Sequence, residues 1–255
     1  MSGHSKWSTI KHQKGAADVK RGALFTKLSR DIVLAVRQGG GGDPDTNFRL
    51  RLAIDKARSN NMPQDNVLKS IKRGTGDGGE ADENLEEFFY EGYGPGGGAI
   101  LLHAVTSNRN RSAAEVRSTF SRGGGSLGES GCVAWNFDNM GVITVEIVDE
   151  ERGEELTLLA IDAGAADVTF EDGLLEVHTT PDQLQEVQKA LEEEGADQIR
   201  SEISMVPRST VVLEADEAER TMKLLDSLED LDDIQKAYTN ADFPTDVLEK
   251  YKTNS

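Results

Sequence analysis

The spacing of apolar residues changes between residues 74 and 84, and this change limits the folds that the chain can adopt. Up to residue 73, apolar residues recur at steps of three and four, as on one face of an α-helix. After residue 84, "EEFFYEGYGPGGGAILLHAVTSN" predicts two strands around a glycine-rich turn. The segment between them, "GTGDGGEADEN", is glycine-rich, acidic and aperiodic, which is typical of a linker. The sequence therefore predicts a helical N-terminal domain followed by a part that contains β-sheet.

The N-terminal domain is predicted to contain three helices, over residues 17–38, 44–59 and 64–73. The first has an apolar stripe of Phe25, Leu28, Ile32 and Val36 and an opposite basic side of Lys20, Lys27, Arg30 and Arg37. Asp43 followed by Pro44 predicts the start of the second helix, and Gly74 predicts the end of the third. We therefore expect a three-helix bundle behind an extended basic arm.

The rest of the chain is predicted to mix helices and strands. Ser112 and Glu115 form a capping box that predicts the start of a helix, and residues 132–148 predict a β-hairpin that turns at residues 138–141. Helix-to-strand units then recur, which favours open-faced α+β sandwiches of the split βαβ kind. The predicted fold class is α+β, with an N-terminal three-helix domain followed by two ferredoxin-like α/β sandwich domains, the third inserted into the second.

The predicted domains follow from these elements. Residues 1–76 form the basic arm and the three-helix bundle. Residues 85–148 together with 207–245 form the second domain, and residues 149–206 form the inserted third domain. We expect the segment after the insertion to complete the sheet that begins at residue 85.

The charge of the chain is divided unevenly along its length. The 255 residues carry 28 Lys and Arg against 46 Asp and Glu, a formal net charge of −18. Residues 1–75 hold 15 of the basic and 6 of the acidic residues, which gives +9, and the remaining 13 and 40 give −27. A basic domain on an acidic body predicts a polyanionic partner for the basic end. The alternative interpretation is that the acidity only maintains solubility.

The basic end contains the candidate nucleic-acid contacts, since lysine and arginine neutralise phosphates and Trp7 can stack on a base. The candidates are His4, Lys6, Trp7, Lys11, His12, Lys14, Lys20, Arg21, Lys27 and Arg30. Arg109 and Arg111 precede a predicted helix and form a second candidate contact, because a helix N-terminus favours phosphate. The alternatives are an ordinary solvated surface with Trp7 packed on the bundle and, for the two arginines, helix capping and pairing with acidic neighbours.

The sequence lacks the motifs of catalysis and cofactor binding. Gly74, Gly76 and Gly79 match G-x-G-x-x-G, but a helix precedes them, whereas a dinucleotide site requires a strand there and a helix afterwards. GK[ST], HExxH and CxxC are absent. Cys132 is predicted to be a small core residue of a strand. We therefore expect a non-enzymatic protein with no cofactor, no metal and no small-molecule substrate.

Signals for membranes and secretion are also not found. No apolar run approaches the ~18 residues of a membrane-spanning helix, and the N-terminus lacks the apolar core of a signal peptide. The single cysteine cannot form an internal disulfide, which points to a reducing compartment. We expect a cytoplasmic protein that has no membrane partner.

Several long segments resemble one known family. "GHSKWSTIKHQKGAADVKRGALFTKL", "NMPQDNVLKSIKRGTG", "YEGYGPGGGAILLHAVTSNRNRSAAEVRSTF" and "LDDIQKAYTN" are similar to the signature segments of the YebC family of probable transcriptional regulatory proteins. The likeness runs from residue 2 to about residue 245. The resemblance implies a cytoplasmic, non-enzymatic protein with a helical domain and two α/β domains around a cleft, which acts on gene expression.

The resemblance leaves the nucleic-acid partner open. Family members are described as DNA-binding transcriptional regulators, whereas mitochondrial relatives resemble translational activators that engage the ribosome. None of the three predicted helices stands out as a base-reading helix, and a ribosome binder needs only phosphate contacts, shape and an aromatic stack. We expect a DNA-binding transcriptional regulator, with an RNA-binding translation factor as the alternative. A further alternative is an acidic protein-interaction module, with a protein partner at the acidic cleft.

Overall fold

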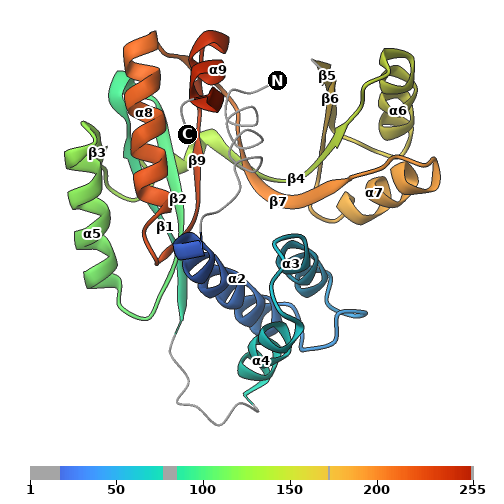
Figure 1. The fold of residues 1–255 in the computed structure, drawn as a ribbon, viewed down its shortest axis with the longest axis horizontal. Helices are drawn as coiled ribbons and strands as arrows, with labels where there is room; N and C mark the ends of the chain where they lie inside the picture. Colours follow the sequence, from blue (N-terminus) through green and yellow to red (C-terminus); the bar gives the residue numbers. More distant parts are fainter. Residues whose placement is uncertain (1–17, 77–84, 172, 254–255) are drawn as a thin grey trace. The chain divides into compact units, whose positions relative to one another are not determined.

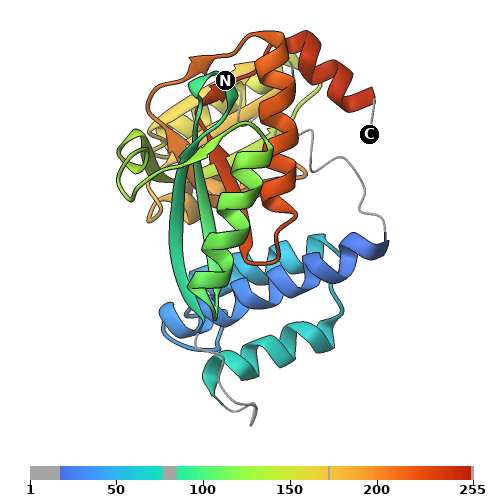
Figure 2. The ribbon, with the colours of Figure 1, turned by 90° about the vertical axis from the view of Figure 1, so that its left-hand side faces the viewer.

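The computed structural model describes residues 18–76, 85–171 and 173–253, and Figures 1 and 2 show it from two directions. The described residues form a mixed α+β fold, in which a helical region precedes two sheet-containing parts. They divide into two compact units. One unit is residues 135–210, and the other is the described chain before and after them.

The helical region is a three-helix bundle within described residues 18–76. Its helices are α2 (Asp18–Gln38), α3 (Phe48–Ser59) and α4 (Gln64–Thr75). Leu28 and Ile32 of the predicted stripe are buried in α2, and they share one apolar core with Leu50 of α3 and Val67 of α4. The predicted apolar stripe is therefore confirmed, whereas Leu34, which lies on the predicted basic side, is buried as well.

The second helix begins later than predicted. Asn47 Oδ1 accepts a hydrogen bond from Leu50 N (3.0 Å), so Asn47 is the N-cap and α3 starts at Phe48 rather than at Pro44. Asn47 Nδ2 also donates to Ala35 O (2.8 Å), which fixes the connection between α2 and α3. The buried Asn47 side chain therefore caps α3, the helix whose start was predicted at Asp43 and Pro44.

The third helix ends later than predicted. α4 continues to Thr75, and Gly76 ends it with a φ of 85°, a left-handed conformation that favours glycine. Gly74 lies within α4 and faces α2, where an added Cβ would lie 2.6 Å from Val36 Cβ. Gly74 therefore permits close helix packing and is not the stop signal.

The first sheet belongs to the same unit as the helical region. Its described strands, in spatial order, are β3 (Ser126–Leu127), β1 (Glu86–Tyr93), β2 (Ala99–Thr106) and β9 (Ile234–Thr239), and all neighbours are antiparallel. Helices α5 (Arg109–Arg122) and α8 (Ala215–Glu229) lie on one face of this sheet (Figures 1 and 2) and share an apolar core with it. The short parallel pair β8 (Val211–Val212) and β10 (Ala241–Asp242) and helix α9 (Thr245–Thr253) complete the unit.

The inserted unit has the βαββαβ order of a ferredoxin-like fold. Its described elements are β4 (Phe137–Glu146), α6 (Glu150–Asp162), β5 (Asp167–Glu171), β6 (Leu174–Thr179), α7 (Leu184–Glu193) and β7 (Arg200–Pro207). The strands lie in the antiparallel order β5-β6-β4-β7, with α6 and α7 on one face (Figure 1). The first sheet has the same spatial arrangement, except that β1, which takes the place of β6, comes first along the chain.

The hairpin expected over residues 132–148 is wrong. β4 is one continuous strand, in which Gly141 pairs with Thr179 of β6 on one side and Ile203 of β7 on the other. Gly141 marks a close approach instead of a turn, because an added Cβ would lie 2.4 Å from Thr179 Oγ1. Since β4 is the first strand of the inserted sheet, this unit begins near residue 135, earlier than the predicted boundary at 149.

Candidate nucleic-acid interface

Most of the predicted basic arm lies outside the described residues. This applies to His4, Lys6, Trp7, Lys11, His12 and Lys14. The other four predicted contacts, Lys20, Arg21, Lys27 and Arg30, all lie on α2. Lys20 and Arg21 are at the beginning of this helix, where the Arg21 side chain is exposed.

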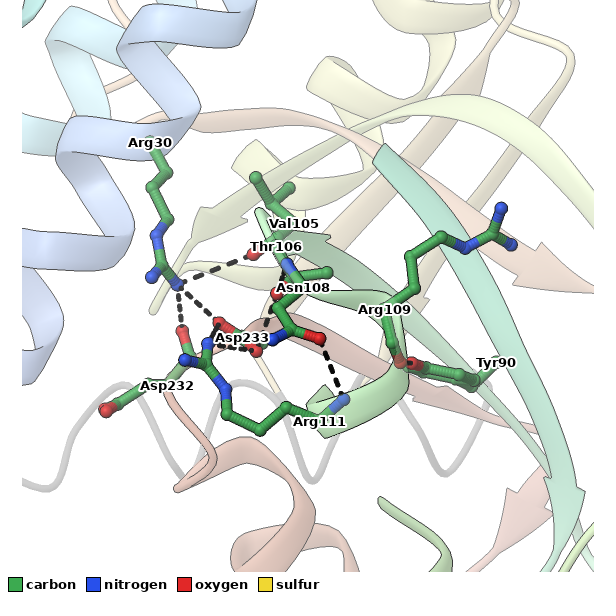
Figure 3. A network of polar contacts seen from close by, with 9 residues as sticks. All are labelled: Arg30, Tyr90, Val105, Thr106, Asn108, Arg109, Arg111, Asp232 and Asp233. Carbon is green, nitrogen blue, oxygen red and sulfur yellow. Dashed lines mark hydrogen bonds and ion pairs between the residues drawn. The ribbon is translucent and has the colours of Figure 1, made fainter. Parts of the chain in front are cut away.

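Lys27 and Arg30 contact the sheet-containing part of their own unit. Lys27 Nζ donates to the carbonyl oxygen of Glu229, the last residue of α8. Arg30 Nη1 donates to Asp232 O at 2.6 Å (Figure 3), and only 18% of the Arg30 side chain is exposed. Both cations therefore bind carbonyl groups at the C-terminal end of α8 and just beyond it, where the helix dipole is negative. These contacts attach the helical region to the first sheet.

Asp233 is the centre of the polar network drawn in Figure 3. Its side chain is 2% exposed, and Oδ2 accepts hydrogen bonds from Thr106 Oγ1 (2.8 Å) and Arg111 Nη2 (3.0 Å). Arg30 Nη1 lies 3.3 Å from the other oxygen. The hydrogen bond to Asp233 and its charge raise the pKa of Arg111 above its ordinary value. One buried carboxylate thus joins α2, β2, α5 and the start of β9.

α5 begins one turn before the predicted capping box. Asn108 Oδ1 accepts from Arg111 N (3.1 Å) and is the N-cap, whereas Ser112 is buried within the helix. Arg109 and Arg111 consequently lie in the first turn of α5 and not ahead of it. The Arg109 guanidinium carbon lies 4.4 Å from the centre of the Phe88 ring, a cation–π distance. Both arginines therefore make contacts with the first sheet unit, although more than half of each side chain is exposed.

A second polar cluster joins the helical region to β1. Glu87 accepts hydrogen bonds from His103 Nε2 (2.7 Å), Gln38 Nε2 (2.8 Å) and Arg49 Nη2 (2.9 Å). The His103 bond, together with Gln38 and Arg49, lowers the pKa of Glu87 from 4.5 to about 2, against the opposing effect of partial burial. Because an ionised carboxylate can only accept, His103 carries its proton on Nε2.

The structure exposes basic residues that the sequence analysis did not select. Lys69, Lys72 and Arg73 are exposed on α4, and their spacing of three and four places them on one helix face. They lie off the apolar side formed by Val67 and Ile71. The sequence contains this pattern, but the prediction relied on the longer run of charges in the arm. α4 therefore adds a basic surface to the helical region.

Glu91 fixes the loop that precedes the 3₁₀ turn η2 (Ala134–Asn136). Its buried carboxylate accepts from the backbone N–H groups of Gly131 (2.6 Å), Val133 (2.7 Å) and Ala134 (2.7 Å). Burial raises the pKa of Glu91, but the three donors outweigh it and leave the pKa below its ordinary value. Cys132 lies in this loop and not in the predicted strand. Burial and the Glu91 charge raise the pKa of the Cys132 thiol, the opposite of what an activated nucleophile requires.

The described residues contain no group of three or more His, Cys, Asp and Glu side chains placed to hold a metal ion. Likewise, none of the described helices is both long and apolar enough to span a membrane. Fold and polar clusters together define a basic helical domain attached to one of two ferredoxin-like α+β units, the second inserted into the first.

The chain belongs to the TACO1/YebC family. Residues 5–77 match the family model of the TACO1/YebC protein N-terminal domain, and residues 85–241 match that of the TACO1/YebC second and third domain. Members of the family are named as regulatory proteins.

Relatives are similar over almost the whole chain. A probable transcriptional regulatory protein of Moorella thermoacetica is 52% identical over 252 residues, and one of Chloroflexus aggregans is 50% identical over 252 residues. Each alignment covers 98% of this chain and 99% of the relative. The crystal structure of a conserved hypothetical protein from Aquifex aeolicus is 43% identical, with a TM-score of 0.80 over 92% of this chain and 96% of that one.

Proposed function

We propose that this protein is a non-enzymatic regulator of gene expression that binds nucleic acid through its basic N-terminal region. The observation that carries the proposal is the division of charge, +9 in residues 1–75 against −27 in the remainder. A polyanion is attracted to the first part and repelled by the second, which gives binding a fixed orientation. The relatives' name, transcriptional regulatory protein, supports the regulatory role.

The proposed phosphate contacts come from the arm and the start of α2. They are Lys6, Lys11, Lys14, Lys20 and Arg21, with His4, Trp7 and His12 supplying shape-dependent contacts. Lys27 and Arg30 bind carbonyl groups beside α8, so we assign them to holding the helical region in place. The exposed face of α4 extends the basic surface, and Arg109 with Arg111 forms the proposed second contact.

DNA and RNA are the two candidate targets. The names of the relatives favour DNA. The exposed aromatic side chains of β1 favour RNA, because unpaired RNA bases stack on aromatic rings. A basic protein partner is the remaining alternative, and the carboxylates on the sheet of the inserted unit favour it.

Ultraviolet crosslinking in living cells, followed by sequencing of the attached RNA and DNA, tests the proposal. The test variant replaces Lys6, Lys11 and Lys14 with Glu. The control replaces the exposed Lys189, Lys223 and Lys250 with Glu, which changes the net charge equally on α7, α8 and α9. We expect the wild type and the control to recover nucleic acid and the arm variant to lose most of it.

The sequences recovered identify the target. Enrichment of ribosomal RNA that depends on the arm indicates a translation factor, and enrichment of discrete promoter DNA indicates a transcriptional regulator. Equal recovery with all three proteins would contradict the role of the arm. Capture of basic proteins without nucleic acid would favour the protein-interaction alternative.

A further inference from the structure

The face of the first sheet that lies away from α5 and α8 carries two exposed aromatic rings. On β1, every second residue from Glu87 to Tyr93 belongs to this face, since Phe88 packs against the core beneath the helices. Phe89 is 42% exposed and Tyr93 is 38% exposed. Four residues of strand separate the two rings by about 13 Å. A flat ligand therefore has access to two separate rings along one strand.

Neighbouring side chains hold Phe89 in place. His103 lies directly opposite it on β2, with ring centroids 5.4 Å apart and ring planes inclined at 33°. Glu87 in turn binds the His103 imidazole at 2.7 Å. Lys236 of β9 pairs with His103 on its other side. The three strands thus present a benzyl ring, an imidazole and an amine in one row.

The two carboxylates of this β1 face are held by donors of the protein. Glu87 accepts from His103, Gln38 and Arg49, and Glu91 accepts from three backbone N–H groups. The Arg49 side chain, which is 42% exposed, pairs with Glu87. Lys236 adds a positive charge two strands away on β9, where its Nζ lies 5.4 Å from the centre of the Tyr238 ring. This surface therefore repels a phosphate far less than the net charge of the chain suggests.

The inserted sheet provides an internal comparison, because it has the same strand arrangement but a different surface. In the described residues, its face away from α6 and α7 contains no Phe, Tyr or Trp on β4 to β7. The charged members of that face are Asp138, Glu146, Asp167, Glu171, Glu176 and Glu202 with a single arginine, Arg200. Of the two related sheets in this chain, only the first combines exposed rings with cations.

We propose that Phe89 binds an unpaired base of a single-stranded RNA by stacking, with the Tyr93 ring as a second stacking position. Four-stranded α+β sheets that bind single-stranded RNA stack bases on aromatic residues of their central strands. An exposed ring favours single-stranded RNA over duplex DNA, because RNA loops present unpaired bases, whereas duplex DNA keeps its bases within the stack. This inference rests on the proposed function, since it requires that the protein binds nucleic acid.

Fluorescence anisotropy with three labelled oligomers tests the stacking site on the full-length protein. The probes are an octauridylate RNA, an eight-unit abasic ribose-phosphate of equal charge, and octathymidylate DNA. The variants are Phe89→Ala and Phe89→Leu, the second of which keeps an apolar side chain but removes the ring. Leu158→Ala is the control, because it removes a 65% exposed apolar side chain from α6 of the inserted unit.

We expect the wild type to bind octauridylate more tightly than the abasic oligomer and at least as tightly as octathymidylate. Both Phe89 variants should bind octauridylate roughly 5- to 100-fold more weakly, bind the abasic oligomer as the wild type does, and keep the same salt dependence. Leu158→Ala should match the wild type. Because Phe89 lies outside the core, thermal unfolding of the variants should be unchanged, and 4-thiouridine in the RNA should crosslink to residues 86–93.

Other results would overturn the inference or the function on which it rests. Unchanged affinity of both Phe89 variants, or equal binding of octauridylate and the abasic oligomer, would overturn the stacking site while leaving phosphate binding intact. Tighter binding of DNA than of RNA would overturn the choice of ligand. If the wild type binds none of the oligomers, the proposed function fails together with the inference.

Discussion

At the scale of single residues, the most instructive carboxylate is Asp233. In the sequence it is one of 46 acidic residues and stands next to the exposed Asp232, so nothing local marks it as buried. Its partner Arg30 lies about 200 residues away, and no spacing rule connects the two. The fold alone brings them together, and for that reason the sequence analysis placed Arg30 among the phosphate contacts.

Replacing Asp233 by Ala should lower the free energy of unfolding by about 2–4 kcal/mol, because Arg30 and Arg111 lose their shared buried carboxylate. The half-exposed Arg111 retains part of its hydration, which keeps the expected loss below that of a fully buried pair. Urea unfolding measures the change. Asp232→Ala is the control and should cost less than about 0.5 kcal/mol, since Asp232 contributes its carbonyl and not its exposed side chain. Equal effects of the two substitutions would contradict this role.

Glu87 predicts a dependence of stability on acid. Its pKa is about 2 in the folded protein against 4.5 ordinarily, so the ionised group stabilises the fold above pH 4.5. This contribution should decline as the pH falls from 4.5 and be lost below about 2. The difference in unfolding free energy between the wild type and Glu87→Gln should therefore shrink over this range. An NMR titration of the Glu87 carboxyl that gives a pKa near 4.5 would refute the prediction.

At the scale of elements, glycine explains where the sequence analysis succeeded and where it failed. The run that ends α2 and the turn between β1 and β2 are read correctly, because several glycines together mark a change of direction. Gly74 and Gly141 are single glycines that permit a close approach to Val36 and Thr179. The sequence shows that a side chain is missing at these positions, but it does not show which neighbour occupies the space.

Gly153 on α6 allows a direct test of this argument. An added Cβ there would lie 2.2 Å from Cζ of Phe170 on β5, so Gly153→Ala should lower the free energy of unfolding by about 1–3 kcal/mol. Gly22→Ala on α2 is the matched control, because an added Cβ at Gly22 meets nothing within 4 Å. That change should stabilise the protein by up to about 1 kcal/mol through helix propensity. Thermal unfolding of the two variants should shift in opposite directions, and a shared direction would contradict the packing argument.

At the scale of the whole molecule, the change of apolar period predicts the order of the parts correctly. The helical region and the sheet-containing part after it follow from this change. The second sheet-containing part and the return of the chain to the first sheet at β9 follow from the recurring helix-to-strand units. The start of the inserted unit follows from neither. The segment around Asp138 and Gly141 suits two short strands joined by a turn as well as it suits one long strand. Only the pairing with β6 and β7 shows that residues 137–146 form a single strand. The contacts of Lys27 and Arg30 with carbonyl groups beside α8 were not predicted either, because these partners are distant in the sequence.

The measurement that tests the central claim most directly is the affinity for nucleic acid as a function of salt concentration. If the basic region neutralises about six phosphates of duplex DNA, log affinity should fall with log salt at a slope near −5, or near −4 on a single strand. Replacement of Lys6, Lys11 and Lys14 by Glu should make the slope shallower by about 3, whereas the Lys189, Lys223 and Lys250 control should leave it unchanged. A slope near zero in the wild type, or an equal slope in all three proteins, would contradict the account.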